Sequence, residues 1–139
     1  MNEEIFNKIM NTSFSSSIIT HCRLKYYSKI AETTEDHISR IGLGLSLSAG
    51  SIDFDWKPSA LGNIDVPITV DSGKSIRAKT LFKEDLLIFI ALANKYQTIE
   101  SYEEYRSGFR AHWERGIQLI TEKSNGSSEW ITIMESISK

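Results

Sequence analysis

The sequence has little cysteine and no strong excess of charge of either sign. The single cysteine, Cys22, excludes an intramolecular disulfide and cannot by itself supply a cysteine-based zinc site. The chain has 16 basic and 18 acidic residues, so its formal charge of −2 is not that of a polycation. Any nucleic-acid binding must therefore come from a local basic patch.

Long apolar runs and a basic leader are also missing. The longest apolar run, residues 86–93, is far shorter than the about 20 residues of a membrane-spanning helix. The first residues, 1–4, are acidic, whereas a secretory signal peptide begins with basic residues. These absences predict a soluble, cytoplasmic protein with no membrane partner.

What the sequence does contain is an ordinary globular composition, with 40% hydrophobic and 24% charged residues. A chain of 139 residues suits one compact domain, so we expect a single domain over residues 1–139. Apolar residues recur mostly at helical spacing, which predicts a mostly α fold.

In the first part of the chain, apolar spacing predicts helices over residues 2–10 and 22–32. Between them lies a serine-rich stretch that could add a short strand at residues 17–20. Thr33 with Asp36 resembles a capping box, which marks the beginning of the next helix.

The segment 41–48 is ambiguous. Its apolar residues alternate with period two, which favours a strand. Read as a helix, it carries the small residues Gly42, Gly44 and Ser46, and glycines inside a helix indicate close approach by another backbone. The residues alone leave both interpretations open.

A β-hairpin is predicted next, with strands at residues 66–70 and 75–79, the first confined to an edge by Pro67. Thr80 is a favourable N-cap for an apolar helix over residues 81–96.

The last part of the chain carries clear helix signals. Ser101 with Glu104 forms a capping box ahead of a long helix with an aromatic stripe, which we expect to be core. The pair at residues 125–126, Asn-Gly, ends that helix, and Ser127 caps a short final one.

Motifs for catalysis are incomplete. Residues 73–75 match the end of a phosphate-binding P-loop, but Ile68 stands where the first glycine is required. The carboxylates at residues 84–85 suit the first turn of a helix better than acid–base chemistry. We therefore expect no enzyme activity, no cofactor and no metal. No helical metal pair is formed by the histidines, which are His21, His37 and His112.

One segment, residues 72–83, carries four basic residues and no acid. They are Lys74, Arg77, Lys79 and Lys83. The predicted hairpin leads here into a helix N-terminus, where backbone N–H groups can bind a phosphate.

A second basic set lies on the early helix and just after it, and consists of Arg23, Lys25, Lys29 and Arg40. A solvated charged face would have the same composition, so composition alone does not decide between a phosphate-binding surface and a solvated face.

Two segments, residues 23–50 and 73–92, resemble the DndE family, small subunits of the bacterial machinery that replaces a non-bridging phosphate oxygen of DNA with sulfur. The resemblance covers residues 23–123. In the family pattern a glycine often stands at the position of Lys83. The motifs that carry the resemblance are Arg23-Leu24, the run Arg-Ile-Gly-Leu-Gly-Leu-Ser-Leu at residues 40–47, and Thr-Leu-Phe-Lys-Glu at residues 80–84.

The resemblance implies a mostly helical subunit with a ribbon-helix-helix-like core, assembled as a homotetramer. It also implies binding to duplex DNA, with a preference for nicked duplex, and partnership with the subunits DndC and DndD. The sulfur chemistry belongs to those partners and to a cysteine desulfurase. Within the single domain it assigns residues 1–21 to an N-terminal extension, 22–124 to the core and 127–139 to a C-terminal helix.

We therefore expect a non-catalytic, DNA-binding subunit, with a helix at residues 41–48. The alternatives are an accessory nucleotide hydrolase or nicking enzyme, and a pure assembly scaffold. Small residues expected at the oligomer interface are Gly42, Gly44 and Ser46. Basic residues expected to contact DNA phosphates are Lys74, Arg77, Lys79, Lys83, Arg23, Lys25 and Arg40.

Overall fold

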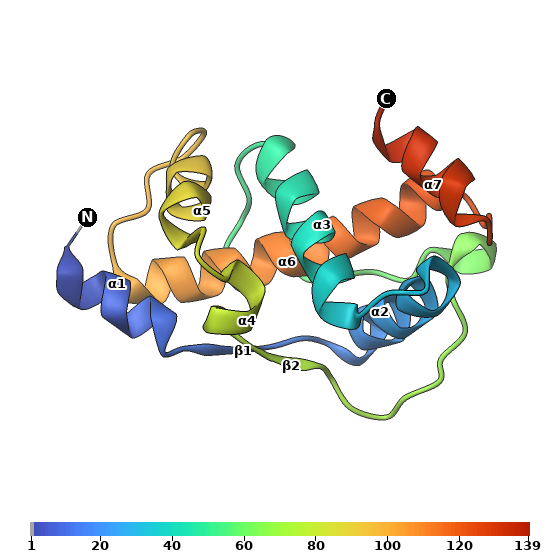
Figure 1. Cartoon of the computed structure of the whole chain (residues 1–139), viewed down its shortest axis with the longest axis horizontal. Helices are drawn as coiled ribbons and strands as arrows, with labels where there is room; N and C mark the ends of the chain where they lie inside the picture. Colours follow the sequence, from blue (N-terminus) through green and yellow to red (C-terminus); the bar gives the residue numbers. More distant parts are fainter. Residues whose placement is uncertain (1) are drawn as a thin grey trace.

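The computed structural model describes residues 2–139 and is mostly helical, with a small two-stranded antiparallel sheet (Figure 1). Among these residues, no helix has the length and apolar character needed to cross a membrane. The elements in chain order are α1 (Glu3–Met10), β1 (Ser13–Ser15), α2 (Ile18–Ala31), α3 (Glu35–Ser48), η1 (Gly62–Ile64), β2 (Ser75–Arg77), α4 (Ala78–Phe82), α5 (Leu86–Ala93), α6 (Tyr102–Ser124) and α7 (Trp130–Ile137).

Helix α6 runs along the length of the molecule, and α3 crosses it (Figure 1). The predicted capping box is present: the Ser101 hydroxyl accepts from the Glu104 N–H at 3.1 Å, and the Glu104 carboxylate accepts from the Ser101 N–H at 3.0 Å. The predicted aromatic stripe is buried, with Phe109 1% and Trp113 0% exposed. This helix therefore forms the centre of the core.

The segment 41–48 is helical, and its small residues serve a contact within the chain. A Cβ atom on Gly42 would lie 2.7 Å from Ile117 Cδ1 of α6, and one on Gly116 would overlap the Gly42 carbonyl. Only glycine allows the two backbones to approach this closely. Gly42 thus faces α6, not the oligomer interface where we expected it. Gly44 differs, because nothing described lies within 4 Å of its ideal Cβ position.

A buried polar cluster lies at the same α3–α6 contact. The Ser46 hydroxyl lies 2.8 Å from His112 Nδ1 and accepts from Arg115 Nε at 2.8 Å. Burial, and then the Arg115 charge, lower the pKa of His112 from 6.5 to about 4, so its imidazole is neutral at physiological pH. Ser46, also expected at an oligomer interface, is therefore engaged within the chain.

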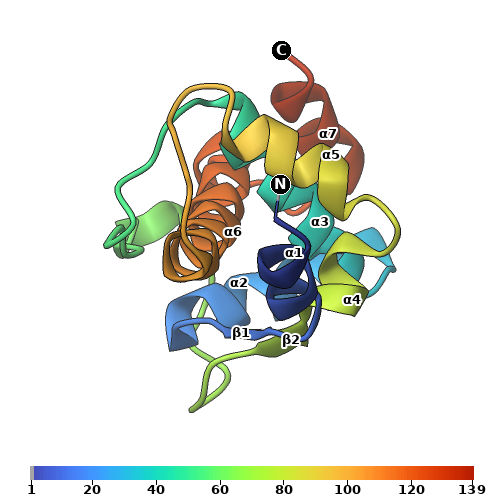
Figure 2. The same ribbon diagram turned by 90° about the vertical axis from the view of Figure 1, so that its left-hand side faces the viewer.

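The predicted hairpin is wrong. Residues 66–70 form no strand, and β2 pairs instead with β1, in the register Phe14 opposite Ile76. Both of these side chains are buried, at 2% and 3% exposure, so the pairing is fixed by the core. The predicted strand at residues 17–20 is also misplaced, because Ser17 is the N-cap of α2. Figure 2 shows the β1–β2 pair at the base of the molecule, close to α1.

The predicted helix over residues 81–96 is broken into α4 and α5. Lys83 ends α4 with φ 51° and ψ −123°, a backbone conformation that favours glycine. Thr80 lies inside α4, whose N-cap is Arg77, so the prediction of a Thr80 cap is wrong. The break lets both short helices place apolar residues in the core, including Phe82 at 0% exposure.

Two other predicted caps are displaced. Thr34, not Thr33, caps α3, and its hydroxyl accepts from the His37 N–H at 3.1 Å. Helix α7 has Glu129 at its N-cap, and the Ser127 hydroxyl accepts from the Glu129 N–H at 3.2 Å. Such shifts move a helix end without changing which helices form.

Candidate anion-binding surface

Arg23 is not at the surface. Its side chain is 0% exposed, and its Nε and Nη2 atoms donate to the two carboxylate oxygens of Asp65 at 3.0 and 2.7 Å. Further donations go to Gln118 Oε1 at 3.3 Å and to the Ser59 carbonyl at 2.7 Å. Arg23 therefore holds the loop before β2 against α2 and α6. Because its guanidinium is inaccessible to solvent, it cannot reach a DNA phosphate in this conformation, contrary to our expectation.

Asp65 is the acidic half of this buried pair. Burial raises the pKa of its carboxyl, but hydrogen bonds from Arg23 and from two backbone N–H groups lower it more, so the net pKa lies below the ordinary value. Sequence reasoning missed the pair because its two members lie on different elements.

Lys74 and Lys25 both lie beside Glu35, at the beginning of α3. Lys74 Nζ lies 3.4 Å from Glu35 Oε1 and 3.7 Å from Asp36 Oδ1, and Lys25 Nζ lies 3.6 Å from Glu35 Oε2. The segment 72–83 contains no acid in sequence, but the fold supplies these acids from α3. Their carboxylates offset the two lysine charges locally, which reduces their attraction for a phosphate.

The P-loop-like residues 73–75 are held by Ser16. The Lys74 N–H donates to Ser16 Oγ at 2.9 Å, and the Lys74 carbonyl accepts from the Ser16 N–H at 2.8 Å. A Cβ on Gly73 would overlap the Ser16 carbonyl. The backbone N–H and the ammonium of Lys74, which a nucleotide-binding loop would direct at phosphates, are both engaged within the chain.

Two further predicted residues lie near α4. Arg40 Nη1 donates to the Thr80 carbonyl at 3.1 Å and is half-buried between α3 and α4. Lys83 is exposed at the break between α4 and α5. Arg40 thus has a structural contact, whereas Lys83 is open to solvent.

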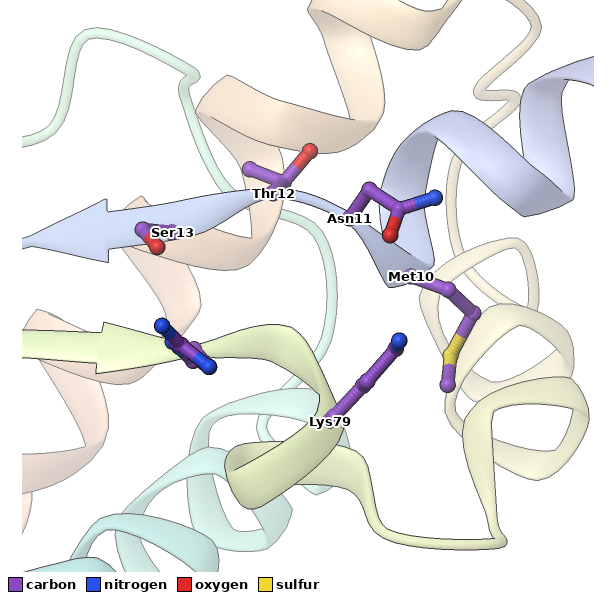
Figure 3. A pocket seen from close by; sticks show the side chains of 6 residues that line it. Met10, Asn11, Thr12, Ser13 and Lys79 are labelled. Carbon is purple, nitrogen blue, oxygen red and sulfur yellow. The ribbon is translucent and has the colours of Figure 1, made fainter.

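Arg77 and Lys79 differ from Arg23, Lys25, Lys74 and Arg40, and they differ from Lys83 in lining a pocket. Both are exposed, and neither belongs to an ion pair within residues 2–139. They line a pocket of about 220 Å³, which we call the first hollow. In Figure 3 the Lys79 side chain extends from α4 toward the end of α1. The remaining lining residues are Met10, Asn11, Thr12 and Ser13.

The first hollow is framed by the strand pairing. Ser13 is the register partner of Arg77, and both are exposed, on the face opposite the buried Phe14. The Ala78 N–H donates to the Thr12 carbonyl at 2.8 Å, and the Thr12 hydroxyl contacts the hydroxyl of Tyr102 on α6 at 2.6 Å. These bonds engage the Ala78 N–H and the Thr12 hydroxyl within the chain, so the exposed polar groups beside the two cations are the Asn11 side-chain amide and the Ser13 hydroxyl.

The N-terminal residues of the first hollow were missed by sequence reasoning. Their only signal was the serine-rich bias just before α2, which carries no charge and suggests no ligand by itself. Their role depends on β1 pairing with β2, and this pairing joins distant parts of the chain.

The chemistry of the first hollow is that of oxyanion binding. An arginine presents a planar fork of N–H donors, and a lysine adds a mobile point charge. Over the described part of the chain, no group of three or more His, Cys, Asp or Glu side chains is arranged to hold a metal ion.

Comparisons of the chain with family models, with curated proteins and with solved structures find no match.

Proposed function

We propose that this chain is a non-catalytic, DNA-binding subunit of a DNA phosphorothioation complex, and that Arg77 and Lys79 contact the phosphates of duplex DNA. The observation that carries the proposal is the first hollow, where two exposed cations without carboxylate partners in residues 2–139 lie beside hydroxyl and amide groups. The resemblance of residues 23–123 to the DndE family supplies the biological setting.

Contacts of this kind bind without reading sequence. Each lysine or arginine placed on a phosphate releases condensed counterions, so affinity falls steeply as salt rises. Phosphate contacts position a protein on DNA but carry no base information. The proposed subunit would therefore hold DNA, in the cytoplasm, while its partners DndC and DndD carry out or support the chemistry. A preference for nicked duplex is part of the same proposal.

The fold proposal is a ribbon-helix-helix-like core. It is supported by the order β1, α2, α3, a strand followed by two helices, with β2 as the second strand of the ribbon. In this chain the ribbon is completed internally, so strand pairing between two copies is not needed to form it.

The assembly proposal is a homotetramer. It no longer rests on Gly42 or Ser46, which contact α6 of the same chain. It is supported by α5, whose residues are all apolar and two of which, Leu87 and Ile88, are 62% and 59% exposed. Light scattering should give a mass above the 15.8 kDa of one chain, and Leu87→Ser with Ile88→Ser should lower that mass. A monomer at micromolar concentration would contradict this proposal.

The experiment that tests DNA binding is fluorescence anisotropy of labelled intact and nicked duplexes over a salt series, without metal. The variant Arg77→Ala with Lys79→Ala should lower the slope of log affinity against log salt by about 1.8, since each lost phosphate contact removes about 0.9. The matched control is Lys57→Ala with Lys123→Ala, which makes the same charge change at exposed positions outside the first hollow.

The control separates local contacts from net charge. If both double variants weaken binding equally, the first hollow is not the contact. If the wild-type protein binds neither duplex at low salt but still associates with DndC or DndD, the scaffold interpretation replaces ours. Metal-dependent cleavage or nucleotide hydrolysis would instead favour the enzyme interpretation.

A further inference from the structure

A second hollow adjoins the first at β1 and is lined by residues of β1 and α6. Its volume is about 260 Å³. Ser13 lines both hollows, so they meet at the outward face of the strand. The second hollow is lined by Ser13, Phe14, Ser15, Arg106, Ser107 and Arg110.

The two arginines of the second hollow differ in how they are held. Arg110 Nη1 donates to Glu114 Oε2 at 2.7 Å, and its Nη2 donates to the carbonyls of Phe54 and Trp56, each at 3.1 Å. These bonds use its guanidinium to fix the loop after α3 against α6. Arg110 is therefore a structural residue whose removal would disturb the fold.

Arg106 is held much more loosely. Its one ion pair within residues 2–139 is with Glu103, at 3.9 Å, and the two side chains are 56% and 74% exposed. An exposed pair of this length contributes little, because water screens it and ordering two long side chains costs entropy. Arg106 can therefore exchange this carboxylate for a phosphate without breaking a buried contact.

The strand between the hollows can bridge them. Ser13 and Ser15 are exposed on the outward face, while Phe14 between them is buried. Arg77 extends from the neighbouring strand and Arg106 from α6, so cations stand on both sides of the two hydroxyls. A serine hydroxyl can donate a hydrogen bond to a phosphate oxygen.

We propose that the two hollows form one track for a nucleic-acid backbone, with one phosphate at Arg77 and Lys79 and another at Arg106, and with the β1 serines between them. The chemical reason is that Arg77 and Lys79 line one hollow and Arg106 lines the other, so successive phosphates of one strand could each meet a cation. This inference rests on the proposed DNA binding and deepens it by assigning Arg106 to the contact.

The test uses the full-length protein and the same anisotropy salt series with a labelled intact duplex. Arg106→Ala should lower the slope of log affinity against log salt by about 0.9, the effect of one phosphate contact. The control Lys123→Ala lies on the same helix but about 25 Å further along its axis, and should leave the slope unchanged.

A second variant tests whether Arg106 contacts a phosphate or only supports the fold. Glu103→Gln removes the competing carboxylate and should tighten binding in the wild-type background. In the Arg106→Ala background the same change should have a smaller effect, because the released cation is absent. Equal effects in both backgrounds would indicate a change in net charge alone and would overturn the track.

The outcomes separate the two proposals. If Arg77→Ala with Lys79→Ala lowers the slope and Arg106→Ala does not, the track is refuted and the first hollow stands. If the wild-type protein does not bind duplex at low salt, the proposed function fails and the track fails with it. Circular dichroism of each variant verifies that it is folded.

Discussion

Acid should destabilise this domain through His112, the imidazole buried between α3 and α6. Burial, followed by the Arg115 charge, lowers its pKa from 6.5 to about 4 in the folded chain. The unfolded chain takes up a proton near pH 6.5, whereas the folded chain takes it up only near pH 4. Because the unfolded state binds more protons between these values, the free energy of unfolding falls as the pH falls through that range.

The size of the effect follows from the two pKa values. A tenfold difference in proton affinity corresponds to about 1.4 kcal/mol, so the loss is roughly 3 kcal/mol once the pH is below 4. At pH 5 the unfolded imidazole is almost fully protonated and the folded one almost fully neutral, and the loss is about 2 kcal/mol. That is a large part of a typical stability of about 5–15 kcal/mol.

The assay is urea unfolding followed by tryptophan fluorescence at pH 8 and pH 5, for the wild type and for His112→Gln. Glutamine does not titrate, so the variant should lose about 2 kcal/mol less than the wild type between the two pH values. Equal losses would refute the reasoning. Should the variant fail to fold, an NMR titration of the wild-type imidazoles decides the question: a His112 resonance that titrates near pH 6.5 contradicts it.

Three further predictions concern stability and are checked by urea unfolding. Gly116→Ala should destabilise the domain by several kcal/mol, because its methyl group would overlap the α3 backbone. Gly44→Ala should stabilise the domain by about 1 kcal/mol, because alanine has the higher helix propensity and its methyl group meets no neighbour. If Gly116→Ala were the more stable of the two variants, the close approach of α3 and α6 would be contradicted. Arg23→Ala should cost about 3 kcal/mol, because it leaves the largely buried Asp65 carboxylate with only the Leu61 and Val66 backbone N–H donors, and a cost below 1 kcal/mol would contradict the structural role of the pair. Lys83→Gly should stabilise by about 1 kcal/mol, because it relieves left-handed backbone strain, and destabilisation would show that the strain is absent.

Helices were predictable from sequence wherever their signals lie within one turn. The capping box at Ser101 and Glu104 marks the beginning of α6, and Asn125 adopts the left-handed conformation that ends it. The break at Lys83 was not predictable from side-chain chemistry, because lysine is a good helix former and a positive φ is uncommon for it. The only signal was the resemblance to the DndE pattern, in which a glycine often stands at this position.

Strand pairing was mispredicted because local and distant partners compete. The turn signals between residues 70 and 75 favour a hairpin at residues 66–79, since short loops cost little entropy to close. The actual partner of Ile76 is Phe14, and what selects it is burial of both side chains in one core. Periodicity in the sequence shows that Ile76 is buried on one face, but it cannot show against which strand.

For the basic residues too, the sequence does not show which distant side chain each one contacts. Arg23, Lys74 and Arg77 look alike in sequence, each lacking an acid immediately beside it. The fold pairs Arg23 with Asp65, brings Lys74 to Glu35, and leaves Arg77 exposed. Sequence could therefore suggest the segment around Arg77 but could not separate its free cations from its structural ones.

The pairing of β1 with β2 has a consequence for when the candidate surface exists. The two strands flank α2, α3 and the long loop that follows, so they can meet only after this intervening chain has been made. In a nascent polypeptide that has not yet reached Ser75, β1 has no partner and neither hollow is formed. The first hollow is therefore complete only once Lys79 has been made and the second only once Arg110 has been made, so a shorter nascent chain lacks the surface that we propose binds phosphates.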